Sequence, residues 1–152
     1  MKNRTAKLLL FFAFTILLTF ISGCSENDDR IPYSYVNVVI YPDLPAYSEI
    51  KTPMNHIYLD QKDFMYCGYA GIIVYCEQID MYKAYERNCP HNPHNKNAIL
   101  DVDSTNLFMV CRDCGSKFSI LYGDKVDGPA KYPVVQYKTE LRYNRSLYIS
   151  NY

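Results

Sequence analysis

Four residues near the middle of the chain have the types and spacing of a metal site. Cys89 and His91 form a Cys-x-His pair, and Cys111 and Cys114 form a Cys-x-x-Cys pair. Two ligands one or two residues apart can reach one metal from a single turn, and two such turns can face each other. The set offers three sulfurs and one imidazole, ligands that suit zinc and iron–sulfur centres.

The segments around these pairs read as short strands rather than helices. Expected strands cover 33–41, 56–59, 72–75, 81–85, 98–102, 107–110, 134–137 and 147–149, with Val36, Val38 and Ile40 on one face of the first. Gly123-Asp124 and Asp127-Gly128-Pro129 mark turns. Many short strands with turns about every ten residues favour an all-β fold, a small β-barrel or sandwich. Each ligand pair then lies on a loop between two strands.

The N-terminus has the pattern of an export signal. Lys2, Arg4 and Lys7 precede an apolar run over 8–21, which is shorter than the roughly 20 residues of a membrane span. The run ends in Ile21-Ser22-Gly23-Cys24, which resembles a bacterial lipoprotein signal that is cut before a cysteine that takes up lipid. We expect a signal peptide over 1–23, an acidic tether over 24–31, and one domain over 32–152. The lipid on Cys24 would hold the protein in a membrane.

Acidic residues directly after Cys24 resemble the export signal of surface lipoproteins, and a flexible polar tether would look the same. We expect the outer membrane, at its periplasmic face or at the cell surface. Without residues 1–23, 13 of the 16 basic residues remain against 16 acidic ones, which leaves a net charge near −3. This balance, with no basic stripe, argues against nucleic acid as a partner.

The residues around the two ligand pairs resemble the Rieske iron–sulfur proteins. Cys89-x-His91 resembles their first box, and Cys111, Gly115, Ser116 and Phe118 match the second, usually Cys-x-x-His-Gly-Ser-x-Phe. Gly128-Pro129-Ala130 matches the turn after that box. The resemblance covers about residues 66–138 and is closest to Rieske-like lipoproteins of Bacteroidota. It implies a Rieske-like barrel in which residues from about 86 to 120 form an inserted two-loop cluster-binding subdomain.

The resemblance also implies a [2Fe–2S] cluster, with one departure from the family. Cys114 stands where the family has its second histidine. Carried over, Cys89 and Cys111 would hold one iron, and His91 and Cys114 the other. A thiolate adds negative charge, so we expect a reduction potential between the roughly −150 to +300 mV of Rieske centres and the about −400 mV of plant-type clusters.

Other uses of the same four residues stay open. A Cys₃His set is an ordinary structural zinc site. A Cys111–Cys114 disulfide needs no metal, and a Rieske-like fold can lack its cluster. The functional alternatives are therefore a one-electron carrier that meets a protein redox partner, and a non-redox structural or interaction lipoprotein. Neither implies a small-molecule substrate, and we expect no catalytic site of the protein's own.

Two further cysteines, Cys67 and Cys76, flank Gly68 and Gly71. If that stretch is a hairpin, a disulfide between them is expected. The alternative is two buried thiols that pack as small apolar side chains. His94 follows His91 beyond Pro93, and we expect it to face solvent from the loop.

Overall fold

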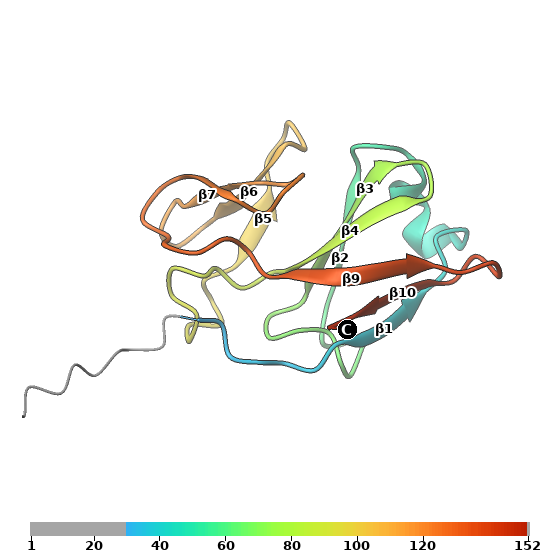
Figure 1. Cartoon of the computed structure of the whole chain (residues 1–152), viewed down its shortest axis with the longest axis horizontal. Coiled ribbons are helices and arrows are strands. Elements are labelled where there is room, and N and C mark those ends of the chain that lie inside the picture. The colour runs from blue at the N-terminus through green and yellow to red at the C-terminus, as the bar shows by residue number, and fades with distance from the viewer. Residues whose placement is uncertain (1–29, 152) are drawn as a thin grey trace, which may run out of the picture.

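The computed structural model describes residues 30–151 and confirms an all-β fold with one short 3-10 helix (Figure 1). The predicted signal peptide, Cys24 and most of the predicted tether lie outside the described residues. Within them, no helix is long and apolar enough to cross a membrane. The elements are β1 (Asn37–Ile40), η1 (Pro45–Lys51), β2 (His56–Leu59), β3 (Ile72–Gln78), β4 (Met81–Glu86), β5 (Leu100–Val102), β6 (Phe108–Cys111), β7 (Lys117–Ser119), β8 (Lys125–Asp127), β9 (Gln136–Leu141) and β10 (Leu147–Ser150).

Six strands form the larger sheet, in the order β1-β10-β9-β4-β3-β2, with every neighbouring pair antiparallel. A bridge between Val36 and Cys67 joins the β1 edge to the segment after β2, so the sheet curls into a half-barrel. The expected alternation in the first strand is confirmed, because Val36, Val38 and Ile40 are all buried in the barrel core.

The two loops that carry the predicted ligands, here called the ligand loops, are the Cys89 loop between β4 and β5 and the Cys111 loop between β6 and β7. Both adjoin a second, four-stranded sheet in the order β5-β6-β7-β8, which lies beside the larger sheet (Figure 1). It is inserted between β4 and β9, as the sequence predicts, but it reaches Asp127 rather than ending near residue 120. The short strand β8, at Lys125–Asp127, extends it beyond the predicted boundary.

Strand β3 explains how the two parts pack. Ile72, Val74 and Cys76 belong to the barrel core, whereas Ile73 and Tyr75 belong to the core beneath the smaller sheet. Since side chains alternate along a strand, β3 has both faces covered and is apolar throughout its buried part. The second core also contains Cys89, Cys111 and Phe118, so the ligand loops are fixed to the barrel by apolar packing.

Candidate metal centre

Strand β5 and the residues just before it hold both ligand loops. On the first loop, the Cys89 N–H donates to the carbonyl of Ala98 at 2.7 Å. On the second, the Arg112 N–H donates to the carbonyl of Ile99 at 3.2 Å. Because these two acceptors are neighbours in the chain, the two cysteine-bearing loops are fixed at the same point.

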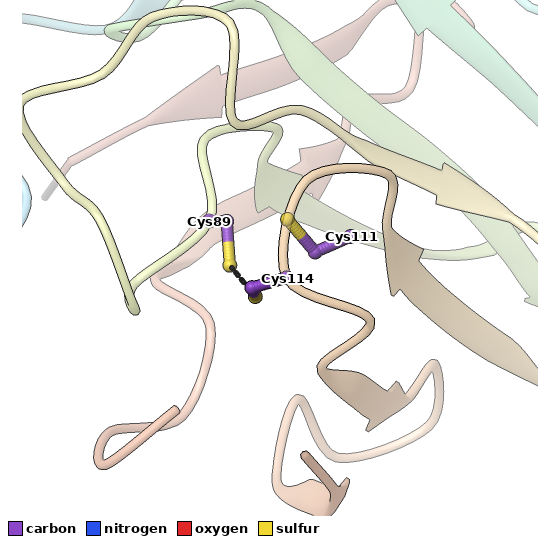
Figure 2. A group of neighbouring side chains, drawn as sticks. All are labelled: Cys89, Cys111 and Cys114. Carbon is purple, nitrogen blue, oxygen red and sulfur yellow. Dashed lines mark hydrogen bonds between the residues drawn. The ribbon is translucent and has the colours of Figure 1, made fainter. Parts of the chain in front are cut away.

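The three cysteines of the two loops come together, with all three Sγ atoms within 4.8 Å of one another. Figure 2 shows Cys89 from one loop facing Cys114 from the other, with Sγ atoms 3.7 Å apart. Two thiolates on one tetrahedral metal, with a bond length of about 2.3 Å, have sulfurs about 3.8 Å apart. Cys89 and Cys111 are buried, and Cys114 is partly exposed. The donor set and its spacing therefore fit a thiolate-bound metal.

Polar hydrogens of the loops point at these sulfurs. The His91 N–H donates to the Cys89 sulfur, but burial dominates, and with the Cys111 thiol beside it raises the pKa of Cys89. Burial also acts to raise the pKa of Cys114, but hydrogen bonds from the Ser116 hydroxyl and N–H, and from the other two cysteines, outweigh it and lower that pKa. Such bonds stabilise thiolate, which is the form that binds metal.

Ser116 joins the second loop to the segment that follows the small sheet. Its buried Oγ lies 3.1 Å from the Cys114 sulfur and accepts a hydrogen bond from the Ala130 N–H at 3.0 Å. Since the Ala130 bond uses a lone pair, the Ser116 hydroxyl hydrogen is available to the sulfur. Gly128 (φ +89°) packs so closely that a Cβ there would lie 2.5 Å from the Ser116 Cα. This contact explains the glycine of the Gly-Pro-Ala segment.

Of the four predicted ligands, three meet and one does not. His91 lies on the Cys89 loop with an exposed side chain, and it is not part of the three-sulfur group. Its role as fourth ligand stays a prediction. His94 is exposed on the same loop, as expected.

The predicted Cys67–Cys76 disulfide is not formed, which corrects the hairpin interpretation. Both are buried free thiols: Cys67 donates to the Leu59 carbonyl at 3.2 Å and Cys76 to that of Gln78 at 3.1 Å. Cys76 also pairs through its N–H with Asn55, at the opposite end of β2 from Leu59. Four residues of strand span about 13 Å, far beyond the Cα separation of under about 7 Å that a disulfide needs. Burial raises the pKa of Cys67 to about 12.

The sequence analysis did not single out two charged residues, Glu86 and Arg87, which lie three and two residues before Cys89. The Glu86 carboxylate is fully buried and accepts hydrogen bonds from the backbone N–H groups of Tyr69, Ala70 and Asn88. The next residue, Arg87, contacts the small sheet. The one available signal was their position, since a Glu-Arg pair directly after a buried strand is an unusual place for two charges.

Comparison with known proteins gives little. No family model matches the chain, and no curated protein matches it. One solved structure with a related shape is a chain from the "Complex of reduced oxygenase and oxidized ferredoxin in carbazole 1,9a- dioxygenase". It has 18% sequence identity and a TM-score of 0.46, and the match covers 77% of this chain and 93% of that chain. A match at this level of similarity does not indicate what the protein does.

Proposed function

We propose that this protein is a membrane-anchored one-electron carrier with a [2Fe–2S] cluster held by Cys89, His91, Cys111 and Cys114. The observation that carries the proposal is the three-sulfur group on two loops, which the sequence motifs single out and which the folded chain brings within 4.8 Å. A cluster of this kind accepts and returns one electron. A protein partner would supply or take that electron.

The chain's own residues would set the properties of such a centre. The His91 N–H donates to the Cys89 sulfur, and the Ser116 hydroxyl would donate to the Cys114 sulfur once that thiol is ionised. Hydrogen bonds to sulfur tune the potential of iron–sulfur centres. Burial of Cys89 and Cys111 keeps water from one side of the group. Partial exposure of Cys114 leaves the other side open to a partner.

A redox titration followed by electron paramagnetic resonance tests this proposal. We expect a one-electron signal in the reduced state, with a midpoint between about −400 and −150 mV. Cys114→His should raise the midpoint, because it replaces a negative ligand by a neutral one. A protein with no paramagnetic reduced state would contradict the proposal.

A structural zinc site is the second candidate, and one observation favours it. The Cys89–Cys114 sulfur distance of 3.7 Å and the closeness of all three sulfurs are what one tetrahedral ion requires. Ligands divided between two irons would be spread more widely. Zinc would hold the same loops together without redox activity, and its protein would be colourless and silent in the titration.

The anchor is a separate part of the proposal. We propose that Cys24 carries lipid and places the domain at the outer membrane, on the evidence of the apolar run and the Ser-Gly-Cys ending. Mass spectrometry of protein from a membrane fraction should show a chain that begins at a lipid-modified Cys24. Cys24→Ser should release the protein from that fraction, and a membrane-bound Cys24→Ser chain would contradict the anchor.

A further inference from the structure

Arg87 lies two residues before the first predicted ligand and is tied to the fold through its backbone. Its N–H donates to the Gly71 carbonyl at 3.0 Å, and its carbonyl accepts the Leu100 N–H at 2.8 Å. The first bond joins it to the start of β3, and the second to β5 of the small sheet. Arg87 is therefore the point at which the chain crosses from the barrel into the Cys89 loop.

Each of the three nitrogens of the Arg87 guanidinium has a polar partner. Nε donates to the Leu100 carbonyl at 3.2 Å, and the two terminal nitrogens lie 2.9 Å from Asp101 and 3.5 Å from Asp60. Its Cζ lies over the Tyr58 ring, 4.2 Å from the centroid. The side chain is only 15% exposed. A lysine carries one compact charge and cannot reproduce a planar fork stacked on a ring.

Asp101 extends this contact to the second ligand loop. One of its oxygens binds Arg87, and the other binds Nε of Arg112, the residue after Cys111. Arg112 is 72% exposed, so its ion pair is screened by water and contributes little. The Arg87 side of the bridge is mostly buried and has three further partners. The Arg87–Asp101 contact therefore does more than the Arg112–Asp101 contact to position the two ligand loops.

We propose that Arg87 is a positioning residue that sets the approach of Cys89 to Cys111 and Cys114. The inference rests on the proposed use of these thiols as metal ligands. Arg87 touches no sulfur. It acts by fixing the origin of the Cys89 loop against β5, the strand whose N-terminal flank also holds the Cys111 loop.

Cobalt(II) titration of the reduced, metal-free protein tests this role, because Co²⁺ absorbs visibly when thiolates hold it tetrahedrally. We expect Arg87→Lys to weaken Co²⁺ binding about 10- to 100-fold, the usual loss when a group that orients ligands is removed. Asp101→Asn, which preserves shape, should weaken it in the same direction. It also serves as the second variant if Arg87→Lys does not fold.

The chain offers a matched control in Arg142, after β9. Its guanidinium lies over the Tyr148 ring, 3.3 Å from the centroid, and pairs with Glu140 at 3.3 Å. It is another arginine that stacks on a tyrosine and pairs with a carboxylate, but it lies on the hairpin between β9 and β10. Arg142→Lys should leave Co²⁺ affinity unchanged. Equal weakening in both lysine variants would overturn the inference, because it would show only general destabilisation.

The outcomes separate this inference from the proposed function. Wild-type protein that binds no Co²⁺ would contradict metal binding by the cysteines. The positioning role would then be tested by the affinity of the protein for phenylarsine oxide, which bridges adjacent thiols without any metal. Folded Arg87→Lys protein should bind this arsenical at least 10-fold more weakly than wild type. Unchanged affinity for both probes would overturn the role of Arg87.

Discussion

Glu86→Gln should destabilise the protein more than its small change in shape suggests. Four donors converge on this buried carboxylate. They are the N–H groups of Tyr69 (2.6 Å), Ala70 (2.9 Å) and Asn88 (3.0 Å), and the hydroxyl of Tyr137 (2.6 Å). The contacts fix the loop before β3 and the residue before Cys89. Gly68 packs against the same group, since a Cβ there would lie 2.6 Å from Oε2.

The expected magnitude follows from the count of donors on each oxygen. Two donors meet Oε1 and two meet Oε2, so an amide nitrogen in either place loses two bonds and faces two hydrogens. Hydrogen bonds to a charged group contribute about 1.5–3 kcal/mol each, which gives a loss of about 3–6 kcal/mol. That is a large share of the about 5–15 kcal/mol by which domains are stable.

Urea unfolding of the metal-free protein, followed by circular dichroism, measures this loss directly. Tyr137→Phe removes one of the four donors and should cost about half as much as Glu86→Gln. Glu140→Gln is the control: Glu140 is exposed and should change stability by less than about 0.5 kcal/mol. One ordinary hydrogen bond contributes about 1 kcal/mol to stability. A Glu86→Gln protein whose free energy of unfolding lies within about 1 kcal/mol of the wild-type value would therefore refute the view that four donors anchor Glu86.

Two further variants test single contacts. Gly128→Ala should destabilise the second ligand loop by about 2 kcal/mol or more, because the new Cβ would lie 2.5 Å from the Ser116 Cα at a φ of +89°. The variant should also lose its metal to a chelator faster than wild type. A variant as stable as wild type would contradict this packing. Arg145→Gly has a pH-dependent effect, because hydrogen bonds from Arg145 lower the pKa values of Asp43 and Asp80 below 3.8. That stabilisation is present above pH 3.8 and disappears as the pH falls through the lowered values, whereas glycine relieves the φ of +65° at every pH. The unfolding temperature of the glycine variant should therefore rise relative to that of wild type as the pH falls. A difference in unfolding temperature that stays constant from pH 7 to pH 2 would be inconsistent with the ion pairs.

Local patterns predicted the parts of the fold that alternation and turn residues encode. The predicted strand 56–59 coincides with β2, and β1 lies within the longer predicted strand 33–41. The gathering of Cys89, Cys111 and Cys114 follows from loops that strands fix. These features depend on neighbours in the sequence. Strands β7 and β8 were missed because each has a single apolar residue, Phe118 or Val126, and so shows no alternation.

Long-range contacts account for the remaining differences. The partners of Glu86 lie 16 and 17 residues upstream and 51 residues downstream, so its burial could not be read from neighbouring residues. The Cys67–Cys76 prediction failed for a related reason. It assumed that the intervening glycines turn a hairpin, whereas β3 pairs with β2 across a loop of residues 60–71. Spacing alone did not show which strand would be the partner.

Metal and sulfide analysis of protein purified without oxygen tests the central claim most directly. The mature domain, with Cys24 replaced by serine, should contain about two irons and two acid-labile sulfides per chain, the content of one [2Fe–2S] cluster. One zinc per chain, or a folded protein with no metal at all, would contradict electron transfer by this centre.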